Sequence, residues 1–309
     1  MRPPGVLLWL LAAALMLGGG HARAGGEIAV VMRTADDAHR ETLAAIRDTL
    51  QTPLPGLQVN EIDISATAKA RLAEASVIVS LGSHAAHVVA DCQLSKPVIH
   101  SLLSESAWQS LPAHHYGAGR PSAILLDQPA TRQVALLELA LPDWRRVALL
   151  AGPQTGPTQR QLTTAAKAAQ FEVREATVSS ERELFPALQR VLREPAVLIV
   201  TPDSRIFNGY TVQNVLLTAY RHRSPVLGFS AAYVRAGALL GLYSTPAQIG
   251  QQTADMILRL LDGQSLPPTQ VPQAFEVAVN TNVARSLGIS LDSAQALTAA
   301  LARQEAGGR

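Results

Sequence analysis

Apolar residues along this chain follow two alternating patterns. Short runs rich in valine, isoleucine and leucine alternate with stretches in which apolar residues return every third or fourth position. The first pattern is typical of strands buried in a sheet, and the second indicates amphipathic helices. The expected strands are Glu27–Met32, Leu57–Ile64, Ser76–Leu81, Pro97–Leu102, Ser122–Leu126, Arg146–Ala151, Phe171–Thr177, Ala196–Thr201, Pro225–Phe229, Ala238–Tyr243 and Phe275–Asn280.

The most clearly bounded helix is expected over Pro246–Asp262. Thr245 precedes it and Gln248 follows with the spacing of a capping box. The proline at the start suits a first helical turn. Gly263 can end the helix in the left-handed region. Both ends of this helix are therefore predicted from local chemistry.

Other helices are marked by apolar stripes, and one of them also by a cap. Ser180 and Glu183 have the spacing of a second capping box. A helix is expected over His84–Gln93, and it contains Cys92, the only cysteine. The chain therefore has no intramolecular disulfide. Two predicted helix faces are formed by Leu43, Ile46 and Leu50, and by Leu184, Leu188, Val191 and Leu192.

The repeated alternation of strand and helix predicts an α/β fold with parallel sheets covered by helices. Eleven strands exceed a comfortable single open sheet, so two doubly wound, Rossmann-like lobes are expected. No glycine- or serine-rich linker divides the chain, and short crossings between the lobes are expected. In such sheets, ligands bind beyond the carboxyl ends of the strands.

The amino terminus has the pattern of a cleavable secretory signal over residues 1–24. Arg2 precedes the apolar run Val6–Leu17, and Ala22-Arg23-Ala24 offers a small-x-small cleavage site. The apolar run is too short to span a bilayer as a helix. No cysteine stands directly after the cleavage site, so a lipoprotein is not expected. These features predict a periplasmic protein.

Charge excludes one class of partner. The chain has 26 basic and 24 acidic residues, and removal of Arg2 and Arg23 with the signal leaves equal numbers. A nucleic-acid-binding protein normally draws its affinity from clustered basic charge. Nucleic acid is therefore not an expected partner.

The second half carries a family resemblance in three segments. They read RRVALLAGPQTGPTQRQL, AVLIVTPDSRIF and FEVAVNTNVARSLGISL. Over roughly residues 130–292 the chain resembles the ABC transporter substrate-binding protein family, which includes tryptophan- and tyrosine-type solute receptors. The resemblance implies a type I periplasmic-binding-protein fold with a three-crossing hinge. It also implies a first lobe of residues 25–124 plus about 246–262, and a second of 125–245 plus about 263–309.

The segment 103–121 departs from the family pattern. Members commonly carry a DPV-type motif and then a PGGNVTG-like loop, whereas this chain reads HSLLSESAWQSLPAHHYGAGRPSAILLDQP across the region. Trp108 in this segment can stack on a ligand ring, or it packs as a lid or core residue. The resemblance implies a small polar or amino-acid-like ligand delivered to an ABC permease. The departure leaves a second interpretation, a sensory or accessory module for a membrane histidine kinase or an outer-membrane receptor.

Loops after the predicted strands supply the candidate ligand-binding residues. Each loop opens a helix or follows a strand, where free N–H groups and short polar side chains can meet a ligand. The resemblance adds that Thr155 matches a ligand-contacting hydroxyl and that Pro202-Asp203-Ser204 matches a PDN-like segment. The candidates are Ser83, His84, Asp127, Thr155, Gly156, Asp203, Ser204 and Ser230.

Each candidate also has a purely structural interpretation. Ser83 and Thr155 can cap helices, and Asp203 can hold a turn. Asp127 can bind the amino group of a ligand, or it can cap a helix beginning at Pro129. These alternatives stay open at the level of sequence.

Neither a metal site nor an enzyme is expected. His84 and His87 have helical spacing, and His114 and His115 are adjacent, but no HExxH motif or cysteine pair accompanies them. The segment GFSAA around Ser230 resembles a nucleophile elbow but lacks its final glycine, and no histidine follows it. We expect no cofactor, no catalytic residue and a monomeric protein.

Overall fold

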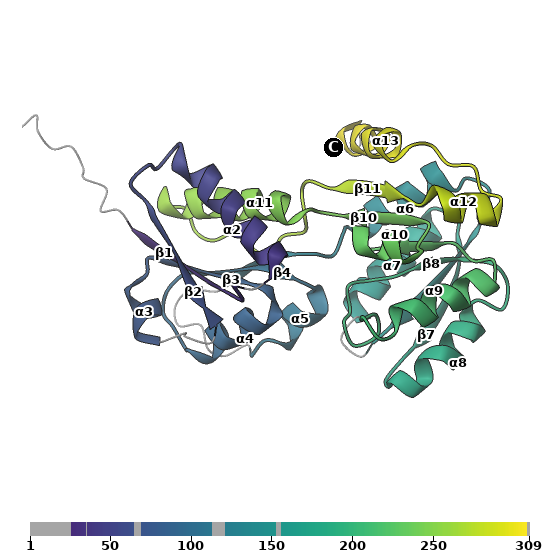
Figure 1. The fold of residues 1–309 in the computed structure, drawn as a ribbon, viewed down its shortest axis with the longest axis horizontal. Helices are drawn as coiled ribbons and strands as arrows, with labels where there is room; N and C mark the ends of the chain where they lie inside the picture. The colour runs from purple at the N-terminus through teal and green to yellow at the C-terminus, as the bar shows by residue number, and fades with distance from the viewer. Residues whose placement is uncertain (1–25, 35, 65–68, 113–120, 153–155, 308–309) are drawn as a thin grey trace, which may run out of the picture.

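The computed structural model describes residues 26–34, 36–64, 69–112, 121–152 and 156–307. Two α/β lobes lie side by side, and each is built on its own sheet (Figure 1). The strands are β1 Glu27–Met32, β2 Gln58–Asp63, β3 Val77–Leu81, β4 Val98–Leu103, β5 Ser122–Leu125, β6 Arg146–Ala151, β7 Glu172–Thr177, β8 Val197–Ile199, β9 Val226–Gly228, β10 Leu240–Tyr243 and β11 Glu276–Val279. The helices are α2 Asp37–Gln51, α3 Lys69–Glu74, α4 Gly82–Asp91, α5 Glu105–Ser110, α6 Ala130–Ala140, α7 Gly156–Ala168, α8 Glu181–Val191, α9 Val212–Arg221, α10 Ala231–Ala236, α11 Pro246–Leu261, α12 Thr281–Leu287 and α13 Ala294–Gly307.

The first lobe holds a five-stranded sheet in the order β2-β1-β3-β4-β5, and its strands pair in parallel. Helices α2 and α11 pack on one face through Leu43, Ile46 and Ile257. Helices α3 and α4 cover the other face through Leu72 and Val89. Both faces are buried, which is why the strands are almost continuously apolar.

Helix α11 lies against α2, although almost 200 residues of chain separate them (Figure 1). The contact is close because Gly250 has no side chain: a Cβ there would lie 2.6 Å from the Thr42 carbonyl oxygen and 2.7 Å from the Ala45 Cβ. The Thr42 hydroxyl also donates to the Pro246 carbonyl oxygen at 3.1 Å. Helix α11 is thus tightly packed against α2.

The second lobe holds a six-stranded sheet in the order β11-β10-β9-β8-β6-β7. All pairings are parallel except that of β10 with β11, which is antiparallel. Helices α6, α7 and α13 bury one face, including Leu137, Leu162 and Leu301. Helices α8, α9 and α10 bury the other, including Leu188 and Val215.

Three chain segments cross between the lobes, and hydrogen bonds link them. The Gln128 side chain on the first crossing donates to the Ser244 hydroxyl on the second at 3.0 Å. The Ser244 hydroxyl donates to the Ala274 carbonyl oxygen on the third. The Leu125 N–H also donates to the Gln270 carbonyl oxygen at 2.9 Å. The crossings therefore form one connected hinge.

The predicted strands are all present, and their ends shift by at most two residues. The capping box of Thr245 and Gln248 is confirmed, and Gly263 has a φ of +82°. The capping box at Ser180 was wrong, because its side chain forms no cap hydrogen bond. The Glu183 carboxylate instead accepts from the Ser179 N–H at 2.8 Å, one residue earlier.

Within the described ranges, every helix is too short or too polar to cross a bilayer. The proposed signal segment, residues 1–24, lies outside those ranges.

Candidate functional site

Each sheet reverses its strand order at one place, and these two places are the natural ligand sites of the fold. In the first lobe the reversal lies between β1 and β3, and in the second between β6 and β8. A crevice forms beyond the carboxyl ends of the strands on either side of such a reversal. The candidate residues that follow β3, β6 and β8 therefore lie at these reversals.

Asp203 follows β8, and its side chain is 2 % exposed. One carboxylate oxygen, Oδ1, accepts a hydrogen bond from the Arg205 N–H at 3.0 Å, so the turn predicted for this residue is present. The other oxygen, Oδ2, is buried and has no hydrogen-bond partner in the described part of the chain. A Cβ on Gly152 would lie 2.7 Å from Oδ2, so the carboxylate is packed against the end of β6.

Asp127 lies on the first crossing and is 8 % exposed. Its Oδ2 accepts a hydrogen bond from the Glu105 N–H at 2.6 Å. The helix-cap interpretation placed it on the wrong helix: α6 begins at Ala130 without a side-chain cap, and Asp127 instead contacts the start of α5. Its carboxylate is thus fixed at the junction between the lobes.

Burial raises the pKa of Asp127 to about 7, because an ionised carboxylate loses its hydration there. The Glu105 N–H opposes this rise, whereas the negative charges of Glu105 and Asp203 add to it. Asp203 belongs to the second lobe and Glu105 to the first. The three carboxylates therefore influence one another across the junction.

The junction is closed by a direct contact between the lobes. The Thr158 hydroxyl, on α7, donates a hydrogen bond to the Glu105 carboxylate, on α5. Thr158 is 5 % exposed. Sequence reasoning placed Glu105 in the divergent segment but missed Thr158, because its spacing from the other candidates carries no signal.

The first-lobe reversal is built around Gly82. This residue has a φ of +83°, and a Cβ would lie 2.7 Å from Nε2 of His39. The ring of His39, on α2, is therefore packed over the start of α4, a placement that the sequence did not indicate. Ser83 and His84 occupy the first turn of α4 and are exposed. The Ser83 side chain does not cap this helix, whose N-cap residue is Leu81.

The remaining candidates are Ser204, Ser230, Thr155 and Gly156, which lie in the second lobe or outside the described residues. Ser204 is exposed beside Asp203, and its carbonyl oxygen accepts from the Asn208 side chain at 3.0 Å. Ser230 caps α10 by accepting the Tyr233 N–H at 3.2 Å, and in the described chain no histidine hydrogen-bonds to it. Gly156 is the first residue of α7, whereas Thr155 lies outside the described residues.

His100 and Trp108 pack together in the first lobe. His100 is fully buried, and its Nδ1 lies 2.6 Å from the Ser80 hydroxyl. Its ring lies 5.7 Å from that of Trp108, which packs on the core as one of its two interpretations proposed. Burial lowers the pKa of His100 to about 3. The pair His114 and His115 lies outside the described residues.

No three histidine, cysteine, aspartate or glutamate side chains of the described chain lie close enough to hold a metal ion.

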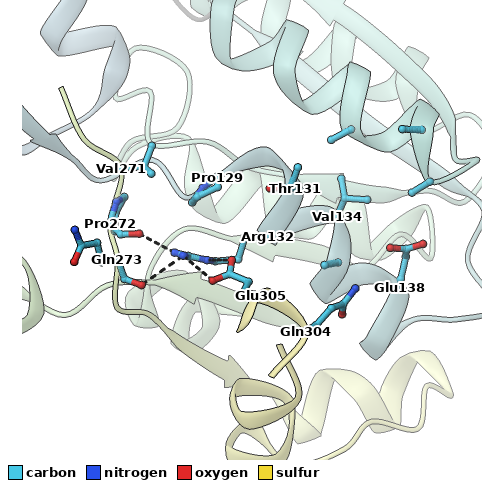
Figure 2. Close-up of a pocket in the computed structure, with 14 residues that line it drawn as sticks. Pro129, Thr131, Arg132, Val134, Glu138, Val271, Pro272, Gln273, Gln304 and Glu305 are labelled. Carbon is cyan, nitrogen blue, oxygen red and sulfur yellow. Dashed lines mark hydrogen bonds and ion pairs between the residues drawn. The ribbon is translucent and has the colours of Figure 1, made fainter. Parts of the chain in front are cut away.

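A groove of about 690 Å³ lies beside the hinge, away from the sheet reversals (Figure 2). Its floor is the guanidinium of Arg132, which forms a bidentate pair with Glu305 at 2.6 and 3.0 Å. The same guanidinium donates to the carbonyl oxygens of Pro272 and Gln273, and it lies 4.4 Å from the ring centre of Phe275. The Arg132 guanidinium also donates to the Gln128 side chain at 2.8 Å, so it links α13 to the first and third crossings.

Comparison with protein families gives one match. A model of the family described as ABC transporter substrate binding protein matches residues 58–301. No curated protein sequence matches the chain significantly.

Solved structures of similar fold include the following three proteins. An ABC domain in complex with L-Trp from Streptococcus pneumonia is 19 % identical, with a TM-score of 0.61, and the match covers 87 % of this chain and 96 % of that one. A ligand-free, open substrate-binding protein with adhesive properties from Clostridium difficile is 15 % identical, with a TM-score of 0.63 over 87 % and 96 %. A periplasmic ribose ABC transporter protein from Conexibacter woesei is 14 % identical, with a TM-score of 0.56 over 88 % and 98 %. The two-lobed fold is therefore that of type I periplasmic-binding proteins.

Proposed function

Because the chain belongs to the ABC transporter substrate-binding protein family, we propose that it is an extracytoplasmic receptor that closes on a small polar or amino-acid-like ligand. In this proposal the lobes comprise 25–124 with about 246–262, and 125–245 with about 263–309. Residues 1–24 act as the secretory signal, and the mature receptor works in the periplasm as a monomer. It delivers its ligand to an ABC permease.

One observation carries the proposed site: Asp127 and Asp203, from the hinge and the second lobe, are both buried at the junction. A buried carboxylate is costly unless it is paired. The unpartnered Oδ2 of Asp203 leaves an acceptor available for an amino or hydroxyl group of a ligand. Ser83, His84, Thr155, Gly156, Ser204 and Ser230 are the further contacts that we propose.

Closure follows from the arrangement of the hinge and the junction. A ligand that contacts both lobes binds the closed form better than the open form, and it shifts the equilibrium by that difference in affinity. The Glu105–Thr158 hydrogen bond adds to the closed form, because its two partners lie on opposite lobes. The permease would then recognise the surface that closure creates.

Calorimetric titration of the mature protein tests the proposal. The protein is unfolded and refolded to remove carried ligand, and then titrated with amino acids, amines, sugars and small acids. We expect saturable binding of one class at about micromolar Kd, or roughly −8 kcal/mol. Asp203→Asn should weaken it, and the exposed control Asp255→Asn on α11 should not.

If the folded protein shows no saturable binding of any compound in the panel, the receptor proposal is contradicted. That result would favour the alternative function, a sensory or accessory module for a membrane histidine kinase or an outer-membrane receptor. The segment 103–121, which departs from the family pattern, would be the first surface to alter in that case.

A further inference from the structure

Three carboxylates lie at the junction between the lobes, and in the described part of the chain no cationic side chain pairs with them. Glu105, Asp127 and Asp203 meet there from α5, the first crossing and the end of β8. No lysine, arginine or histidine side chain of the described residues forms an ion pair with any of the three. The contact between Asp203 and Arg205 is made by the Arg205 main-chain N–H.

The carboxylates differ in how well they are satisfied. Asp127 accepts the Glu105 N–H, and Glu105 accepts the Thr158 hydroxyl. Asp203 keeps a buried, unpartnered Oδ2 that is packed against Gly152 at the reversal between β6 and β8. In native proteins a buried oxygen of this kind normally has a partner. Here the missing partner is a hydrogen-bond donor.

A metal ion does not fit this arrangement. No three acidic, histidine or cysteine side chains of the described chain lie close enough to coordinate one ion. An organic cation does not need three ligands around one centre, and its separate N–H donors can reach more than one carboxylate. Ammonium and guanidinium groups offer such donors, and charge-assisted hydrogen bonds are the strong ones.

We propose that the ligand is an organic cation with net positive charge, whose ammonium or guanidinium group lies between Asp127 and Asp203. This inference rests on the proposed receptor function and names its ligand class. A zwitterionic amino acid would neutralise one carboxylate while bringing another into the junction. A net cation leaves fewer buried charges unpaired, so it is favoured over a zwitterion of the same shape.

A matched set of probes tests the charge of the ligand. L-Arginine and agmatine are titrated into the refolded mature protein alongside L-citrulline, which has the shape of arginine without its charge, and L-tryptophan and succinate. We expect saturable binding of the cations and at least tenfold weaker binding of citrulline, tryptophan and succinate. Asp203→Asn should remove that preference, because Oδ1 still accepts the Arg205 N–H while the charge is lost. The exposed control Asp255→Asn should keep it.

Proton release on ligand binding is a second measurement, and it would not occur if Asp127 had only a structural role. A cation beside Asp127 favours the ionised carboxylate, against the burial and the charges of Glu105 and Asp203 that raise its pKa to about 7. Titrations at pH 7 in buffers of different ionisation enthalpy should therefore detect up to about half a proton released per ligand. Asp127→Asn should abolish the release.

The outcomes separate this inference from the receptor proposal. Saturable binding of citrulline, tryptophan or succinate that equals or exceeds cation binding would overturn the cationic class and leave the receptor standing. The absence of saturable binding by both cations would also overturn the class. If the folded protein also binds none of the amino acids, amines, sugars and acids of the broader panel, the receptor proposal is contradicted as well.

Discussion

The hydroxyl of Thr158 donates a hydrogen bond to the carboxylate of Glu105, and this contact joins α7 of the second lobe to α5 of the first. The main-chain N–H of Glu105 donates in turn to the Asp127 carboxylate. A residue of the hinge, a residue of the first lobe and a residue of the second therefore form one chain of hydrogen bonds. The state of the hinge and the position of α5 are coupled through it.

Thr158→Val should favour the open form. Valine keeps the shape of threonine and removes the donor to Glu105, a bond to a charged group worth about 1.5–3 kcal/mol. We expect a larger radius of gyration in small-angle X-ray scattering and about tenfold weaker ligand binding. Thr163→Val on the same helix is the control, because its hydroxyl contacts Glu175 within the second lobe. Equal scattering from Thr158→Val and the wild type would contradict a role of the Glu105–Thr158 hydrogen bond in stabilising the closed form.

Gly152→Ala should disturb the Asp203 carboxylate. The added Cβ would lie 2.7 Å from Oδ2 and 3.3 Å from Cδ1 of Ile206, so side chains must shift. Overpacking of this kind costs about 1–3 kcal/mol of unfolding free energy, measurable by urea denaturation. Gly209→Ala meets no atom within 4 Å and serves as the control. If both variants unfold at the same urea concentration, the placement of Asp203 against β6 is incorrect.

Asp127→Asn should change how stability depends on pH. The pKa of Asp127 is raised from 3.8 to about 7 in the folded protein, so its contribution to stability is full below pH 4 and is lost as pH rises through 7. The variant should therefore gain stability relative to the wild type over this window, by at most about 4 kcal/mol. Urea denaturation at pH 4, 5.5, 7 and 8 measures the difference. A constant difference at every pH would refute the shifted pKa.

His100→Asn should alter acid stability with the opposite sign. The pKa of His100 is lowered from 6.5 to about 3, so the neutral buried ring contributes stability above pH 6.5 that is lost as pH falls toward 3. The variant lacks this titration, and its unfolding free energy should vary less between pH 6.5 and 4 than that of the wild type. Fluorescence-detected unfolding at each pH provides the comparison. If the unfolding free energies of the two proteins change equally with pH, the lowered pKa of His100 is contradicted.

Glu305→Gln should loosen the hinge. Its carboxylate pairs with Arg132, whose side chain is 3 % exposed, and the loss leaves a buried guanidinium without its counter-charge. Because Glu305 itself is partly exposed, we expect about 2 kcal/mol of destabilisation, less than for a fully buried pair. Thermal unfolding measures it. Asp37→Asn, which removes an exposed pair with Arg40, is the control and should unfold with the wild type.

Local chemistry was sufficient to predict most elements of the fold. Strands such as Glu27–Met32 and Arg146–Ala151 were located from their apolar runs, and α11 from its threonine cap and final glycine. These signals act between residues close in the chain, so they are readable in one dimension. The alternation of the two patterns also indicated parallel sheets in two lobes, because a parallel strand needs a crossover helix.

The composition of the site depended on tertiary structure. Asp127 and Asp203 were each candidates, yet which groups their carboxylates face is decided by crossings and strand order far apart in sequence. Thr158 and His39 were missed because a single polar residue on a helix has no pattern until a partner is packed against it. The same reason explains Asp127, which accepts the Glu105 N–H at the start of α5 and does not cap α6. The sequence by itself determined the elements and the class of fold, and packing alone decided which polar side chains share the junction.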